Sequence, residues 1–210
     1  MRSEYDPLFS GGAAGEAADD LEAVRDRFTR AARPFLRSPW TWVAWALLLP
    51  AAALSTQAVA ARWGPAGVLL LWSGTILGGG AVEAAAIARA GRREPRGPLA
   101  AWVLRMQGNT SLLAVALSAL LLWAGEAWAL PALWLLLLGH SFYLLGGLAL
   151  AAFRQCGLLY QAAGLVTLWP WGWGLEVFAG TTLVGNLWLG WAVWRERSSS
   201  DPPDHRNRKV

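Results

Sequence analysis

The chain has 210 residues, of which 55% are hydrophobic and 15% are charged. Soluble domains carry about 25% charged residues, so the composition excludes an ordinary soluble globular domain. The formal net charge is +4. The arginines flank apolar runs instead of following one polar face, which argues against nucleic-acid binding. One cysteine and two histidines, without metal-ligand spacing, predict neither a metal nor a cofactor.

The two ends of the chain differ in composition from its middle. Residues 1–18 are rich in Gly, Ala and acidic residues without periodicity, which is typical of a disordered tail. Residues 19–37 place apolar side chains at helical spacing among charged ones and predict a short amphipathic helix. This helix is either a solvated lead-in to the membrane, or an element that lies in the headgroup layer or docks on a partner. Residues 196–210 predict a second disordered tail.

Residues 38–195 hold six apolar runs, most of them near the 20 residues that a helix needs to cross a hydrocarbon core about 30 Å thick. The expected spans are 40–61, 66–88, 99–123, 128–153, 157–169 and 174–194. Short turns join the first to the second, the third to the fourth and the fifth to the sixth. The sequence therefore predicts an all-α membrane protein, a bundle of six transmembrane helices in three hairpins, with no evident internal repeat.

The arginines near the span ends predict the orientation. One side of the predicted bundle carries Arg25, Arg27, Arg30, Arg33, Arg37, Arg89, Arg92, Arg93, Arg96, Arg154, Arg195 and Arg197, and the other side carries only Arg62. Positive charge remains on the cytoplasmic side, so both termini are expected in the cytoplasm, in the cytoplasmic (inner) membrane of a bacterium. If the short fifth run were only re-entrant, the basic C-terminal flank would emerge on the opposite side.

The chain contains 15 tryptophans, most of them near predicted span ends. The predicted inner boundary holds Trp40, Trp42, Trp102, Trp191 and Trp194, and the outer one holds Trp63, Trp123, Trp128, Trp169, Trp171 and Trp173. Indole rings concentrate at membrane–water interfaces, so two aromatic belts are expected. A binding surface on which a sugar or an aromatic ligand stacks is the alternative.

Charged side chains inside predicted spans are costly and need a reason. Glu83 lies about six residues before the cytoplasmic end of the second span, and Arg105 about six residues after the cytoplasmic start of the third. Both are therefore about 9 Å inside the inner boundary, on consecutive antiparallel helices, and we expect them to form an ion pair. Independent extension of each side chain toward the interface and a proton or ion site are the alternatives.

Further polar residues lie inside the spans, among them Gln107, Asn109, His140, Tyr160, Gln161 and Asn186. Hydrogen bonds between helices are their ordinary role in a membrane. Alternatively they line one small polar cavity. His140 is adjacent to Ser141 on its helix, so the two side chains do not face each other as a base and a nucleophile would. No catalytic set can be assembled from these residues, and we do not expect an enzyme.

Small residues indicate where a partner could dock. Gly74 and Gly78 lie one helical turn apart on the second span, and Gly146 lies on the fourth. Glycines at such spacing let another helix approach closely. A protein partner is therefore expected on these faces or on the 19–37 helix, with the lipid bilayer covering the rest.

Three segments of the sequence resemble a family of small bacterial six-span integral membrane proteins. They are the stretch from Asp20 to Phe28 with the Phe35-Leu36 entry, the stretch beginning at Pro131, and the closing hairpin that ends at Trp194. The paired hairpins are also distantly similar to the acid-resistance membrane protein group. The resemblance spans residues 20–195 and implies a six-span fold without an assigned activity. We predict a non-catalytic accessory, sensing or assembly module, with a small-solute transporter, or the substrate-binding membrane subunit of one, as the alternative.

Overall fold

The computed structural model describes residues 38–91, 98–146, 150–169 and 172–200, together with Gly15 and residues 19–20 and 23–24. From residue 38 onward these form α2 (Pro39–Gly91), α3 (Pro98–Trp123), α4 (Leu130–Gly146), α5 (Ala151–Thr167) and α6 (Gly174–Ser200), with a 3-10 turn, η1 (Ala127–Ala129), before α4. No described residue lies in a strand. The prediction of an all-α chain is confirmed for this part of the molecule.

Among the described residues, four helices are long and apolar enough to cross a membrane. They cover Pro39–Arg89 within α2, Arg105–Trp123 within α3, Ala127–Gly146 and Gly174–Glu196. The helix α5 has 17 residues and is not among them. The structure therefore supports a membrane protein, as the apolar runs of the sequence predict.

The predicted terminal segments lie mostly outside the described residues. Within the expected 19–37 helix, residues 19–20 and 23–24 are helical. The tail predicted for residues 1–18 is described only at Gly15, and residues 201–210 are not described. One boundary needs correction, because α6 continues to Ser200 and residues 196–200 are helical. The polar composition after Arg195 therefore marks the end of the apolar surface, and the helix continues beyond it.

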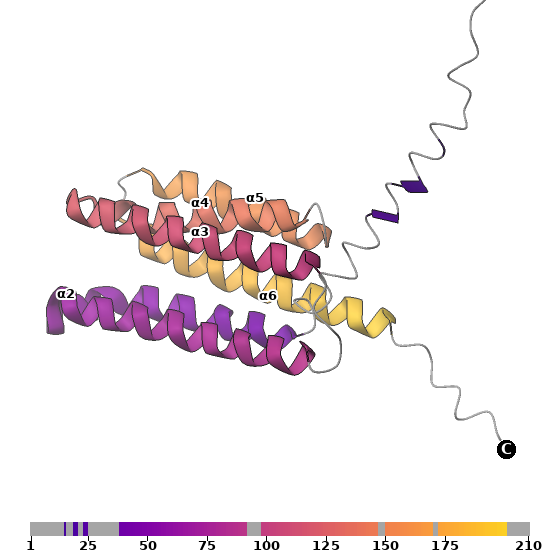
Figure 1. Cartoon of the computed structure of the whole chain (residues 1–210). Helices are drawn as coiled ribbons and strands as arrows, with labels where there is room; N and C mark the ends of the chain where they lie inside the picture. The colour runs from indigo at the N-terminus through magenta and orange to yellow at the C-terminus, as the bar shows by residue number, and fades with distance from the viewer. Residues whose placement is uncertain are drawn as a thin grey trace, which may run out of the picture.

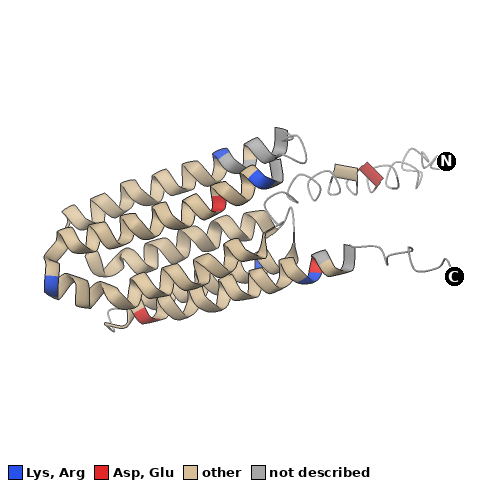
Figure 2. Cartoon of the chain, turned by 90° about the horizontal axis from the view of Figure 1, so that it is seen from below, with Lys and Arg blue, Asp and Glu red and all other residues tan. Residues whose placement is uncertain are grey.

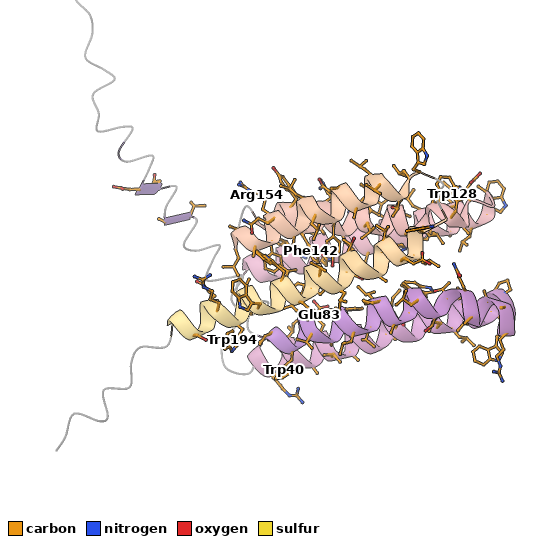
Figure 3. The ribbon with its side chains drawn as sticks, turned by 180° about the vertical axis from the view of Figure 1, so that it is seen from behind. Trp40, Glu83, Trp128, Phe142, Arg154 and Trp194 are labelled. Atoms are coloured by element: carbon orange, nitrogen blue, oxygen red, sulfur yellow. The ribbon has the colours of Figure 1, made fainter. Side chains whose placement is uncertain are left out.

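The long helix α2 is folded back on itself at Gly64, which has a φ of 63°. Its two arms lie side by side and antiparallel, as both Figure 1 and Figure 3 show. The turns between α3 and α4 and between α5 and α6 also contain glycines with positive φ, Gly125 and Gly172. A residue without Cβ adopts this backbone conformation without steric cost. The turn predicted between residues 62 and 65 is confirmed.

The helices pack in an order that differs from their order in the chain. The α2 hairpin packs on α6, α6 packs on α5 and to a lesser extent on α4, α5 packs on α4, and α3 packs on α4. In Figure 1 the α2 hairpin lies below α6, while α3, α4 and α5 lie above it. The first arm of α2 begins, and α6 ends, at the same end of the bundle: a Cβ on Gly190 of α6 would lie 3.5 Å from the carbonyl oxygen of Pro39.

The link between the fourth and fifth helices differs from the prediction. We expected it around Arg154, but α4 ends at Gly146 and α5 starts at Ala151, so Arg154 lies in the first turn of α5. The sequence carries two consecutive glycines at 146–147, and glycine is a poor helix former, which accounts for a helix end at this place. The fifth helix is consequently longer than the predicted 157–169 run.

Glycines bring α4 and α5 into close contact along one seam. A Cβ added to Gly139 of α4 would lie 2.8 Å from the carbonyl oxygen of Gly157, and one added to Gly157 of α5 would lie 2.7 Å from the oxygen of Gly139. At the two ends of the seam, a Cβ on Gly146 would meet the backbone of Arg154, and one on Gly164 would meet Leu136. Small residues allow this approach, which gives van der Waals contact in a solvent as apolar as the side chains.

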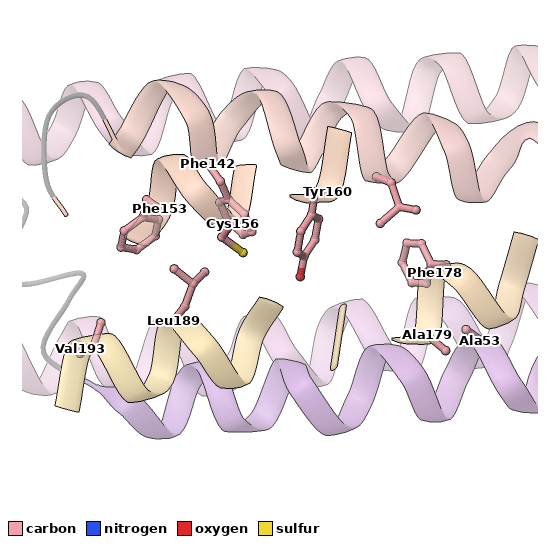
Figure 4. Packing of buried hydrophobic residues seen from close by; sticks show 10 residues of the cluster. Ala53, Phe142, Phe153, Cys156, Tyr160, Phe178, Ala179, Leu189 and Val193 are labelled. Atoms are coloured by element: carbon pink, nitrogen blue, oxygen red, sulfur yellow. The ribbon is translucent and has the colours of Figure 1, made fainter. Parts of the chain in front are cut away.

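Aromatic rings fill the centre of the bundle, between α4 and α5 on one side and α2 and α6 on the other (Figure 4). Phe142 contacts Trp42, Phe153 and Tyr160 edge to face, with ring centroids 5.9, 6.0 and 5.4 Å apart. This arrangement is the favoured geometry for aromatic pairs. Trp42 was predicted in the inner aromatic belt but packs inward, and its buried indole nitrogen has no hydrogen-bond partner among the described residues.

The remaining tryptophans of the predicted belts are mostly exposed near helix ends. Exposed examples are Trp40 and Trp194 at one end of the bundle and Trp128 at the other (Figure 3). Trp171 lies outside the described residues. Charged side chains also gather toward the two ends, and the surface between them is largely uncharged (Figure 2). Both distributions are typical of a helical bundle in a bilayer.

Candidate functional site

The predicted ion pair between Glu83 and Arg105 is not formed. The Glu83 side chain, on the second arm of α2, accepts a hydrogen bond from Trp45 on the first arm. Arg105 is exposed on α3, which packs on α4 rather than on α2. The prediction was wrong because it assumed that consecutive helices are neighbours in space. Glu83 is instead part of the contact between the arms of α2, where Gly79 leaves room for the indole ring of Trp45.

The other predicted polar residues lie at separate helix contacts. Gln107 of α3 accepts a hydrogen bond from Ser141 of α4 at 3.0 Å. Tyr160 of α5 is buried and accepts a hydrogen bond from Asn186 of α6 at 3.1 Å. Asn186 also donates to the carbonyl oxygen of Thr182, one turn earlier on α6, at 2.8 Å. These groups therefore hold neighbouring helices together, in the ordinary role for polar residues in membranes.

Asn109 and His140 have exposed side chains and take no part in these contacts. Gln161 is half-buried on α5, where its backbone nitrogen and side chain lie close to Gly139. The single polar cavity that the transporter alternative requires is therefore not formed by the residues predicted to line it. Their side chains belong to the α3–α4, α4–α5 and α5–α6 contacts or to the outer surface.

Two hydrogen bonds that the sequence did not predict share one pattern. The indole nitrogen of Trp72, on the second arm of α2, donates to the Thr56 hydroxyl of the first arm at 3.1 Å. The indole nitrogen of Trp134 on α4 donates to the Ser118 hydroxyl of α3, also at 3.1 Å. In each pair the two residues are 16 positions apart. Each residue of the second pair lies 62 positions after the corresponding residue of the first pair.

The correspondence extends to further groups at the same offset. The Thr56 hydroxyl donates to the carbonyl oxygen of Ala52, and the Ser118 hydroxyl donates to that of Ala114, each at 2.7 Å. Trp45 packs over Gly79 in the first hairpin. The positions 62 residues after Trp45 and Gly79 hold Gln107 and Ser141, which are joined by a hydrogen bond. The α2 hairpin and the α3–α4 hairpin thus repeat one set of contacts at positions 62 residues apart.

The sequence did not reveal this repeat because few of its side chains are retained. Trp72 and Trp134 are identical and Thr56 and Ser118 both supply a hydroxyl, but most other paired positions only share apolar character. A tryptophan that follows a hydroxyl residue by 16 positions across a tight turn is the one signal that could have indicated it. Its physical basis is the need of an indole N–H for an acceptor where no water is present.

The potential metal ligands and nucleophiles among the described residues lie apart from one another or in the packed interior. Among them, no three or more His, Cys, Asp or Glu side chains lie close enough to hold a metal ion. Cys156 is buried against the aromatic core, and Ser141 donates its hydroxyl to an amide oxygen. A serine activated as a nucleophile would instead face a base.

No family model, curated protein or solved structure matches the chain.

Proposed function

We propose that the chain is an integral protein of the bacterial cytoplasmic membrane that crosses the bilayer six times. Six crossings require that α2 span twice and that α5 span once. Each arm of α2 has about 25 residues, or about 38 Å of helix, which is enough for one crossing. The helix α5 measures about 25 Å, which is short for a transmembrane helix. It packs against both α4 and α6, the helices that precede and follow it in the chain.

The basic residues support an orientation with both termini in the cytoplasm. Arg89 lies in the last turn of α2, and Arg154 lies in the first turn of α5, at the end of the bundle where α6 finishes. Arg62 precedes the Gly64 turn at the opposite end. Cytoplasmic loops carry the excess of arginine in membrane proteins of this kind.

Cysteine labelling tests the topology. In a Cys156→Ala background, which has no other cysteine, we expect Arg62→Cys and Glu126→Cys to react with a membrane-impermeant maleimide in intact cells. Ser38→Cys and Ser198→Cys should react only after permeabilisation, because an even number of crossings returns the chain to the cytoplasm. Labelling of Ser198→Cys in intact cells would show that α5 does not cross and would contradict six spans.

Within this topology we propose a non-catalytic accessory, sensing or assembly module that acts through a protein partner. The observation that carries the proposal is the use of the interior polar groups: Glu83, Gln107, Tyr160 and Asn186 are all engaged in contacts between helices. Small residues remain available on the outer surface, because a Cβ on Gly74 or on Gly78 would have no neighbour within 4 Å. Gly146, by contrast, is occupied by its contact with Arg154 and cannot receive a partner.

Purification from native membranes in a mild detergent tests this function. We expect a second protein to co-purify, and we expect Gly74→Leu with Gly78→Leu, or deletion of residues 1–37, to release it. Gly180→Leu on α6 is the matched control, since Gly180 is also exposed and a Cβ there would have no atom within 4 Å. Recovery of the wild-type chain without any other protein would contradict the proposal.

A further inference from the structure

The helix α3 presents an uncovered face with a regular spacing. Its positions alternate by three and four residues, and every one of them is exposed: Trp102, Arg105, Asn109, Leu112, Ala116, Ala119 and Trp123. This is the spacing of a heptad seam, along which two helices pack side by side. Only 6% of the α3 span is buried inside the bundle, compared with 44% of the α6 span. The helix therefore has one side on α4 and a complete second side without a neighbour among the described residues.

Two residues of this seam are polar where a lipid-facing surface should be apolar. Asn109 lies 11 positions after the start of α3 at Pro98, which is about 16 Å along the helix and well inside a hydrocarbon core. No hydrogen bond of its side chain is formed with another described residue. An amide group in hydrocarbon lacks the water that would satisfy it, so it requires a protein partner.

The repeated hairpin shows that the fold itself does not need these polar residues. The positions 62 residues earlier, on the first arm of α2, are Val43 and Leu47 in place of Arg105 and Asn109. Leu47 is 62% exposed, so it faces outward as Asn109 does. Val43 is half-buried and lies near Gly190 of α6, so only Leu47 occupies an outward-facing place equivalent to that of its counterpart. Asn109 thus places an amide where the first hairpin exposes an apolar side chain, which points to a contact outside its own hairpin.

A second copy of the chain has the chemistry that this seam requires. An asparagine side chain contains both a donor and an acceptor, so two of them pair with each other across a two-fold axis. Two copies in one membrane have parallel α3 helices, and an asparagine at a core position of a parallel seam fixes the register of the pair. Arg105 lies about 10 Å from the start of α3, and its long side chain can extend to the cytoplasmic headgroups.

We infer that α3 is the self-association surface of this protein, with Asn109 paired between two copies. Along the seam, Ala116 and Ala119 follow Leu112 by one and two helical turns, and their small side chains allow the two helices to approach closely there. This inference rests on the proposed membrane topology, because copies that cross the bilayer in one common orientation have parallel α3 helices.

Cysteine cross-linking in native membranes tests the surface. In the Cys156→Ala background, we expect Leu112→Cys and Ala116→Cys to form disulfide-linked dimers on mild oxidation. Leu54→Cys, which occupies the place of Ala116 in the first hairpin and is also exposed, is the matched control and should remain monomeric. Three results would overturn the inference. They are equal cross-linking of Leu54→Cys, a linked product whose mass is not that of two copies of the chain, and the absence of a product at both α3 positions.

Asn109→Leu tests the hydrogen bond within that dimer. We expect it to weaken dimerisation by about five- to thirtyfold, the factor that corresponds to one hydrogen bond between helices in a membrane. Leu47→Ala, at the matching place in the first hairpin, should leave dimerisation unchanged. The thermal unfolding of Asn109→Leu in detergent should match that of the wild type. An unchanged dimer would overturn the inference, whereas a wrong topology would appear independently as maleimide labelling of Ser198→Cys in intact cells.

Discussion

Gly157→Leu is expected to abolish the folded bundle. The Cβ alone would lie 2.7 Å from the carbonyl oxygen of Gly139, and the neighbouring atoms belong to the backbone of α4. Overpacking costs about 1–3 kcal/mol where side chains can move aside, and a backbone cannot do so. Leucine at this position must therefore separate α4 from α5 along the whole glycine seam. We expect a destabilisation above about 3 kcal/mol.

The yield of monodisperse protein in detergent and its thermal unfolding, followed by tryptophan fluorescence, measure this effect. Gly180→Leu is the control, because it makes the same chemical change on α6 in open space. Leucine is about 1 kcal/mol better than glycine in a helix, so the control should be at least as stable as the wild type. A Gly157→Leu protein that unfolds at the wild-type temperature would refute the close contact between α4 and α5.

Phe142→Ala is expected to destabilise the protein by about 3–5 kcal/mol. Removal of a phenyl ring leaves a cavity of about 100 Å³, which costs about 2.4 kcal/mol at about 24 cal/mol per Å³. The change also removes three edge-to-face contacts, those with Trp42, Phe153 and Tyr160. Each such contact contributes about 0.5–1.5 kcal/mol where the rings are well packed.

Tyr143→Ala is the matched control for this variant. Tyr143 follows Phe142 directly on α4 but is 40% exposed, whereas Phe142 is 7% exposed. We expect Tyr143→Ala to change the midpoint of unfolding in detergent far less than Phe142→Ala. If the two variants were equally stable, the aromatic cluster at the centre of the bundle would not be the source of its stability.

Much of the helical architecture could be predicted from the sequence. The apolar runs gave helices at the expected places, and the turn at Gly64 followed from a Gly-Pro pair between two such runs. Membrane helices are locally determined, because every backbone hydrogen bond must be made within the segment. The errors lie where a helix ends without a change of polarity, as at Gly146, and where it continues past one, as α6 does to Ser200.

The candidate site could be predicted only as a set of residues. Glu83 and Arg105 lie at similar predicted depths in the membrane, and this depth follows from counting residues from the ends of the spans. Their partners depend on which helices touch, and in a bundle this is decided by the shape of helix surfaces. Gly79 leaves room for Trp45, which then reaches Glu83. The contact of α3 with α4 leaves Arg105 and Asn109 on the outside.

The sequence by itself determined that the chain is helical and apolar enough for a membrane, and the distribution of its arginines predicts the orientation there. Both properties depend on the chain's own composition and on the bilayer, and neither requires knowledge of a neighbour. Only the tertiary structure decided that α2 packs on α6, that two hairpins repeat one set of contacts, and that the α3 face is uncovered. Lipid is as apolar as leucine, so hydrophobicity does not select helix neighbours, and close packing at glycines with a few hydrogen bonds decides them.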